Sequence, residues 1–148
     1  MPNLIKVLIA DDSVLVRQGL LAALDEYADF GPVEQAASAD QVLAWMAPGR
    51  WDVAILNSTL MDASGIEVLR ALRRTLPELP VVMLHLTPDA QYARLCLRLG
   101  AKGVITQDTG VKAIVQALRA VVRGETYLCP ELAFVLREMS RDNPPAAP

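Results

Sequence analysis

A chain of 148 residues with 53% apolar and 21% charged side chains has the length of one domain and enough apolar material for a packed core, which excludes intrinsic disorder. Its formal net charge of -3 excludes the basic footprint of a protein that binds nucleic acid through charge alone. The sequence has no apolar run long enough to span a bilayer and does not start like a secretion signal, so we expect a cytoplasmic protein. Cys96 and Cys129 lack a metal-type spacing and are expected to be free, buried thiols.

The predicted elements alternate between short apolar runs and amphipathic stretches. In chain order they are a strand at 5–10, a helix at 13–27, a strand at 33–37, a helix starting at Ser38 and ending before Pro48, a strand at 52–56, a helix from Ser64 to Leu76, a strand at 80–84, a helix at 89–99, a strand at 104–106 and a helix at 111–123. Gly31-Pro32 is expected to break the chain before the weak second strand. Ser38 with Gln41 has the capping-box pattern, and Gly100 is expected to end the fourth helix. In the last helix we expect Val111 and Val122 to face inward.

Alternating strands and helices predict the α/β class, with a doubly wound parallel sheet covered by helices on both faces. We expect the flavodoxin-like (βα)5 arrangement with strand order 2-1-3-4-5, followed by a short C-terminal helix at 130–140. The domain is expected to cover 1–128. Residues 129–148 are interpreted as a connector helix and a flexible linker or tail, because 143–148 is rich in proline.

Polar residues follow the first and third predicted strands. Asp11 and Asp12 end the first strand and Asn57 ends the third, and in this topology both strand ends border the point where strand order reverses. Paired acids beside oxygen donors suit a hard cation such as Mg²⁺. The alternative is that Asp12 or Ser13 only caps the first helix.

Several stretches resemble the receiver domains of bacterial two-component response regulators of the NarL/FixJ group. They are Lys6-Val-Leu-Ile-Ala-Asp-Asp-Ser13 and its continuation to Leu20, Trp51–Asn57, Ser64–Leu69, Leu99–Val104 and Gly124–Glu131. The resemblance spans 4–128 and implies a non-enzymatic signalling domain. Its last stretch is similar to the start of the connector that leads to a helix-turn-helix output domain, so one interpretation is that the parent chain is longer and carries such a domain.

The positions that carry phosphorylation in that family depart from its pattern. The family carries a nucleophilic aspartate where this chain has Asn57, and a hydroxyl-bearing residue where it has His85. It carries a lysine, an aromatic residue and a proline where this chain has Gln107, Val104 and Met61. We therefore expect an atypical receiver with no catalytic residue and no required cofactor. A weak Mg²⁺ site formed by Asp11, Asp12, Asn57 and Thr59 is one interpretation of the oxygen donors that are left.

Three positions allow alternatives. Asn57 either hydrogen-bonds its own loop or offers a carbonyl oxygen to a cation. His85, the single histidine, is interpreted as a hydrogen-bonded lining of the pocket, with a pH-sensitive group or a cation ligand as alternatives. A displaced phosphoacceptor would come from Ser58, Thr59 or Asp62, of which Asp62 is the carboxylate but is expected to be badly aimed.

Without phosphorylation chemistry, the function that we expect is binding to another protein or to a second copy of the domain. We expect transcription-related signalling through phosphorylation-independent dimerisation or protein contact, with a pocket that binds a small ligand or cation as the alternative. The resemblance implies association through the fourth helix, fifth strand and fifth helix, or through the first and fifth helices. These faces carry exposed polar groups, which are otherwise a solvated basic stripe: Gln91, Arg94, Arg98, Lys112, Arg119 and Arg123. No membrane contact and no direct nucleic-acid contact by this domain are expected.

Overall fold

The computed structural model describes residues 3–142 and contains one six-stranded parallel sheet in the order β2-β1-β3-β4-β5-β6. The strands are β1 (Ile5–Ala10), β2 (Phe30–Ala36), β3 (Val53–Asn57), β4 (Val81–His85), β5 (Gly103–Thr106) and β6 (Tyr127–Leu128). The helices are α1 (Val14–Asp25), α2 (Ala39–Trp45), α3 (Gly65–Thr75), α4 (Ala90–Arg98), α5 (Val111–Val122) and α6 (Pro130–Asp142). The predicted doubly wound α/β sheet with a C-terminal helix is confirmed.

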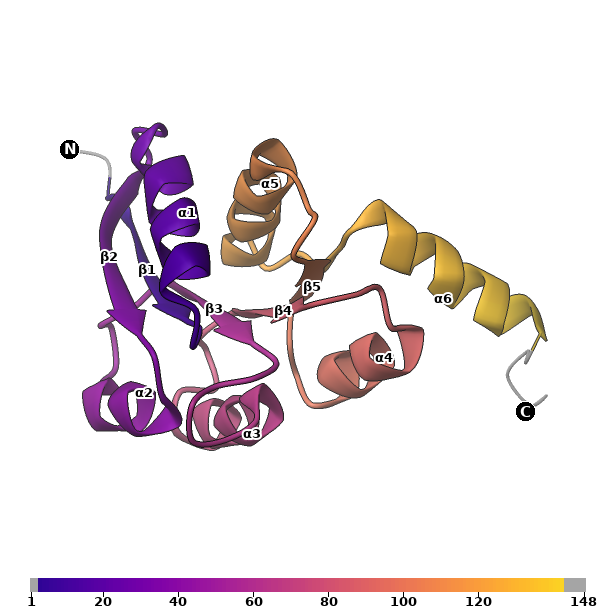
Figure 1. Cartoon of the computed structure of the whole chain (residues 1–148), viewed down its shortest axis with the longest axis horizontal. Coiled ribbons are helices and arrows are strands. Elements are labelled where there is room, and N and C mark those ends of the chain that lie inside the picture. The colour runs from indigo at the N-terminus through magenta and orange to yellow at the C-terminus, as the bar shows by residue number, and fades with distance from the viewer. Residues whose placement is uncertain (1–2, 143–148) are drawn as a thin grey trace.

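Helices cover both faces of the sheet, with α1 and α5 on one face and α2, α3 and α4 on the other (Figure 1). One apolar core lies under α1 and α5, and the other lies between the sheet and the α2, α3 and α4 layer. Every residue of β3 is buried, as expected for a central strand covered on both sides. No helix among residues 3–142 is long and apolar enough to cross a membrane.

Helix starts follow the local signals in the sequence. Ser13 and Ser38 accept hydrogen bonds from the third backbone N–H of α1 and α2, so both act as N-caps. Gln41 completes the capping pattern one residue earlier than the usual box, since its side chain accepts from Ala37 N–H. Gly100 adopts a φ of 101° after α4 and confirms the predicted helix end.

The second strand differs from its prediction. Gly31 and Pro32 lie inside β2, which begins at Phe30, instead of breaking the chain before it. This is compatible with proline because β2 is the edge strand and has no partner on its outer side. The register of the β1–β2 pair shifts between Ile5 and Val7, which absorbs the irregularity opposite these residues.

The C-terminal segment extends the sheet and closes one core. The two-residue strand β6 pairs with β5 and was not predicted, because two residues carry no periodicity. Cys129 and Leu132 are buried in the core of the α4 side, and α6 packs against α4. Cys96 and Cys129 are free and buried, as expected. The predicted tail at 143–148 lies outside the described residues.

Helix α5 corrects one detail of the predicted packing. Val111 and Val122, expected to face inward, are 45% and 38% exposed. They are the first and last residues of α5, at the two ends of the helix. Ile114, Val115 and Leu118 in the middle of the helix are buried, which confirms the apolar face there.

Candidate functional site

The parallel register brings the first and third strand ends together. Ala10 of β1 pairs with Leu56 of β3, so the residues that follow them, Asp11 and Asn57, lie side by side at the carboxyl edge of the sheet. Both are almost fully buried, with 1% and 6% of their surfaces exposed. This is the edge where ligands bind in open α/β sheets. The structure thus confirms the predicted neighbourhood of Asp11 and Asn57.

Asn57 and Asp11 are joined by a side-chain hydrogen bond. The Asn57 Nδ2 group donates to Asp11 Oδ2 at 2.8 Å, and the other carboxylate oxygen accepts from Ser13 N–H at 2.8 Å. Asn57 Oδ1 accepts from Thr59 N–H and from the Ser58 hydroxyl, each at 3.3 Å. A carboxylate only accepts hydrogen bonds, so an amide is the group that can face Asp11 with a donor and still serve the loop with an acceptor.

Burial changes the pKa of Asp11, the titratable member of this pair. Desolvation raises the pKa of Asp11 above its usual value, against hydrogen bonds from Ser13 and Asn57 that lower it, and the charge of Asp12 raises it further. An acid whose pKa is raised by folding binds protons more tightly in the folded state. Its contribution to stability therefore falls as the pH rises from the ordinary value of 3.8 through the raised pKa. Ionised Asp11 thus lowers stability at neutral pH, and the amide of Asn57 limits that cost.

These residues do not fit a Mg²⁺ site as they are arranged. The oxygen of Asp11 that faces Asn57 is already bound to an N–H donor, and Asp12 is exposed. Thr59 meets Asn57 through its backbone N–H. Within residues 3–142 no group of three or more His, Cys, Asp or Glu side chains is placed to hold a metal ion. Mg²⁺ needs a near-octahedral set of oxygens, which a neutral amide that turns its N–H inward does not supply.

His85 at the end of β4 stacks on Tyr92 of α4. Their ring centroids are 4.1 Å apart and the rings are inclined by 14°. Among the described residues, His85 Nδ1 and the Tyr92 hydroxyl are buried without a hydrogen-bond partner, whereas the sequence predicted a hydrogen-bonded histidine. Burial raises the pKa of Tyr92, whose hydroxyl faces Cys96 and Ser58 without hydrogen-bond geometry, and raises the pKa of Cys96 to about 11. Sequence reasoning missed Tyr92; the available signal was its place on the face of α4 nearest the strand end.

The other positions named from the sequence lie apart from the pair. Val104 is buried inside β5, and Gln107 and Met61 are exposed. Asp62 accepts from Ala39 N–H at 2.7 Å and Asp40 N–H at 3.1 Å, so its carboxylate is held at the start of α2. These hydrogen bonds, chiefly that from Ala39, lower the pKa of Asp62. A carboxylate in this position is poorly placed to act as a substitute phosphoacceptor.

Comparisons with a family model and with known proteins agree on one family. The response regulator receiver domain family matches residues 7–119. The response regulator GacA of Pseudomonas aeruginosa is 30% identical over 130 residues, which cover 88% of this chain and 61% of GacA. UvrY of Escherichia coli K12 is 24% identical over 130 residues, which cover 88% of this chain and 60% of UvrY. The chain therefore spans about three fifths of the length of these relatives.

Solved structures agree on the fold. A LuxR-family two-component response regulator from Aurantimonas sp. SI85-9A1 superposes with a TM-score of 0.88 at 22% identity, covering 94% of this chain and 99% of that one. RcsB of Salmonella typhimurium superposes with a TM-score of 0.84 at 19% identity, covering 93% of this chain and 68% of RcsB. At these identities the likeness concerns the fold alone. Together with the family match over 7–119, it shows that this chain belongs to the response regulator receiver domain family of two-component signalling.

Proposed function

We propose that this receiver domain signals without phosphorylation of its third strand end and acts by contact with a second copy of itself or with another protein. The observation that carries the proposal is the hydrogen-bonded pair of Asn57 and Asp11, in which both the nitrogen and the oxygen of the amide have protein partners. A phosphoacceptor needs a free anionic oxygen in line with the donor, and Asn57 has none.

The surroundings of Asn57 support the same conclusion. Phosphoryl transfer is catalysed by placing positive charge and hydrogen-bond donors around the transferred group. At the ends of β4 and β5 stand the stacked His85 and the exposed Gln107, neither of which supplies an ammonium group. Loss of a single such stabilising group in an enzyme costs about 3–4 kcal/mol of transition-state energy. We propose that the domain needs no cofactor for its activity.

The test is covalent modification. Incubated with Mg²⁺ and acetyl phosphate, the purified protein is expected to keep its intact mass, because no nucleophile faces the donor. N57D is treated in parallel: an adduct on N57D assigns the block to the amide alone, and an unmodified N57D assigns it to His85 and Gln107 as well. A phosphoryl adduct on the wild-type protein, at Asp62 or elsewhere, would contradict the proposal.

The surface favours one of the two expected contact faces. The chain's own β6 pairs with β5 and its α6 packs against α4, so part of the α4–β5–α5 face is covered. The α1–α5 face keeps large apolar side chains in solvent, with Val14, Leu15 and Val111 exposed by 59%, 82% and 45%. Large apolar side chains left in solvent on these two helices are typical of a protein contact. We propose that self-association uses the α1–α5 face.

The expected basic stripe is divided in the folded chain. Arg119 is bound to Asp29 at 2.7 Å and lies over the ring of Tyr27, and Arg123 is bound to Glu125 at 2.6 Å. Arg94, Arg98 and Lys112 are exposed, and no ion pair holds them within the described residues. A continuous basic contact surface is thus reduced to these separate cations, and we base the contact face on its apolar groups.

A longer parent protein would complete the signalling chain. The matched relatives extend well beyond the aligned region, and one neighbouring structure is described as two RcsB dimers bound to two parallel DNAs. We propose that this receiver is joined to a DNA-binding output domain in its parent protein, and that the receiver itself contributes dimerisation and not nucleic-acid contact.

A further inference from the structure

A second concave site lies at the opposite edge of the sheet. A groove of about 510 Å³ opens at the amino ends of β3 and β4, whereas Asn57 is the last residue of β3. Its walls are the loop that follows α2, with Pro48 and Trp51, and the loop that follows α3, with Leu76 and Leu79. This volume lies within the range of about 300–1,000 Å³ that small-molecule sites occupy.

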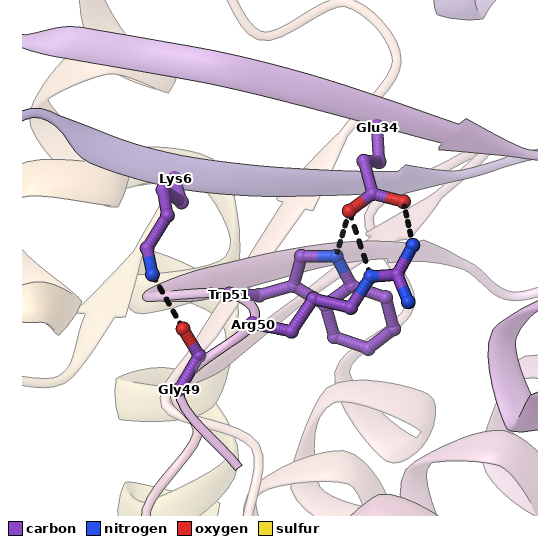
Figure 2. Close-up of polar contacts among 5 residues, drawn as sticks. All are labelled: Lys6, Glu34, Gly49, Arg50 and Trp51. Atoms are coloured by element: carbon purple, nitrogen blue, oxygen red, sulfur yellow. Dashed lines mark hydrogen bonds and ion pairs between the residues drawn. The ribbon is translucent and has the colours of Figure 1, made fainter. Parts of the chain in front are cut away.

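The first wall is pinned to the sheet by side chains (Figure 2). The Arg50 guanidinium donates to both carboxylate oxygens of Glu34 on β2, at 2.8 and 2.9 Å, and the indole N–H of Trp51 donates to the same carboxylate at 3.3 Å. Lys6 Nζ donates to the carbonyl oxygen of Gly49. A loop held at three consecutive positions keeps its shape without a ligand, which lowers the entropic cost of binding.

The second wall is pinned by a different arginine. The half-buried guanidinium of Arg73 donates to the backbone carbonyls of Leu76, Pro77 and Leu79, which form the turn between α3 and β4. Arg73 itself does not line the groove. Its charge is directed to the backbone of the loop, and the side chains of Leu76 and Leu79 remain available to the cavity. Both walls of the groove are therefore preformed.

Charged groups of both signs lie around the groove, and those in its lining are carboxylates. Helix α2 ends at Trp45 and directs its carboxyl terminus, the negative end of the helix dipole, toward the first loop, whereas Arg73 and Arg74 in the last turn of α3 offset the dipole at the second loop. Asp52 and Glu78 add carboxylates to the lining, although one oxygen of Asp52 accepts from Lys6 N–H at 2.9 Å and Glu78 also interacts with Arg73. The lining contains no lysine, arginine or histidine. Lys6 and Arg73 lie outside the lining and donate to backbone carbonyls of the two loops, so the charged groups that face a bound molecule are carboxylates, which favour a cation.

We propose that this groove binds a small organic cation with an apolar body, an amine, amidine or guanidine. The apolar body would pack against Trp51, Leu76 and Leu79, and the cationic group would lie near the carboxylates of the lining, Asp52 and Glu78. This combination follows from an apolar cavity with a few placed polar groups. The site is separate from the Asn57 pair and goes beyond the proposed function, so either can fail without the other.

The test compares three probes of nearly equal shape and different charge. Benzamidine is cationic, benzamide is neutral and benzoate is anionic, and each is titrated into the ¹⁵N-labelled protein while backbone amide shifts are recorded. We expect saturable shifts at Gly49, Asp52 and Glu78 with benzamidine. Two partly exposed carboxylates should make benzamide bind about 3- to 10-fold more weakly. Benzoate should not bind.

Two variants confine the result to the groove. Thr75→Trp fills the cavity from the exposed end of α3 and should abolish the shifts, and Glu78→Gln should weaken benzamidine binding toward that of benzamide. The matched control Glu131→Gln, exposed on α6, should bind like the wild type. The proposal is wrong if benzamide binds as well as benzamidine, if binding does not saturate, if the shifts centre on Asn57, or if Thr75→Trp and Glu78→Gln both bind normally.

Discussion

At the scale of the single residue, the amide of Asn57 replaces a like-charge contact with a hydrogen bond. Its Nδ2 group lies 2.8 Å from an oxygen of the buried Asp11, a distance at which two ionised carboxylates would repel strongly. The same amide is uncharged, so the pocket carries one buried charge instead of two. Asn57 therefore lowers the electrostatic cost of keeping an ionised Asp11 buried.

This account predicts that N57D loses stability and gains a response to metal. Removing the donor and adding a charge next to Asp11 should lower the free energy of unfolding by about 1–3 kcal/mol at neutral pH. Millimolar MgCl₂ should restore part of the loss, because a cation that binds only the folded state stabilises it. Thermal melts with and without MgCl₂ measure both effects, with the wild type as the control that should not respond. Equal Mg²⁺ responses of the two proteins would rule this interpretation out.

Asp62 gives a prediction with a defined pH dependence. Hydrogen bonds from Ala39 and Asp40 lower its pKa below 3.8, so its contribution to stability is present above that pH and is lost as the pH falls through the lowered value. Asp62→Asn should therefore melt below the wild type at neutral pH, and the difference should disappear in strong acid. Asp25→Asn is the matched control, an exposed aspartate at the end of α1. A difference that stays constant with pH would show that the carboxylate charge is irrelevant.

The sequence predicted part of the site at this scale. Asp11 and Asn57 could be placed together because parallel strands bring their carboxyl ends to one edge, a consequence of topology alone. The stack of His85 on Tyr92 could not be predicted, since it depends on the rotamers of two side chains on different elements. Likewise, the capping role of Asp62 depends on the path of the loop after β3, which has no periodic signal.

At the scale of the element, replacing glycine by alanine should have opposite effects on stability in two helices, α1 and α3. A Cβ at Gly65 would lie 2.2 Å from the carbonyl oxygen of Asn57, because the first turn of α3 packs directly on the end of β3. A Cβ at Gly19 in α1 meets nothing within 4 Å. Helix interiors favour alanine over glycine by about 0.5–1 kcal/mol.

Gly19→Ala is therefore expected to raise the melting temperature, and Gly65→Ala to lower it by an amount equivalent to about 1–3 kcal/mol of overpacking. Chemical denaturation of both variants beside the wild type gives the two free energies. Because Gly65 also adjoins Asn57, Gly65→Ala should change the backbone amide NMR shifts of Asn57 and Ser58. Gly19→Ala should leave both shifts unaffected. A stabilised Gly65→Ala would mean that the α3–β3 contact is looser than described.

Elements with strong periodicity were predicted well, and those set by their position in the sheet were not. The helix at α5 is defined by a regular apolar face, which the sequence displays directly. Strand β2 includes Gly31 and Pro32 because it is an edge strand, and β6 exists because β5 offers it an open side. Both depend on neighbours distant in the sequence.

At the scale of the whole molecule, the apolar α1–α5 face predicts the position of the dimer contact. Leu15 is 82% exposed. It lies one helical turn from Gly19, which lines a groove of about 210 Å³ between α1 and α5. Leu15→Glu should raise the dimer dissociation constant at least about tenfold, as for a central contact residue. Because Leu15 is exposed, the stability of the monomer should change by less than about 0.5 kcal/mol.

Sedimentation equilibrium over a concentration series measures the dissociation constant. Leu43→Glu is the matched control: Leu43 is a 40% exposed leucine on α2, on the other face of the sheet. It should associate like the wild type. A monomeric wild-type protein at high concentration, or equal weakening by the two variants, would move the contact away from α1 and α5.

The ends of the sheet have a consequence for how the protein behaves when crowded. An open strand edge can recruit the strand of another molecule and start an aggregate. Here β6 and the chain that follows it limit access to β5, and the opposite edge is β2, in which Pro32 has no N–H to offer and the carboxylate of Glu34 is held by Arg50. Neither border presents a long, regular row of free amide groups. The domain can therefore expose apolar helices for specific association while its sheet resists growing into fibrils.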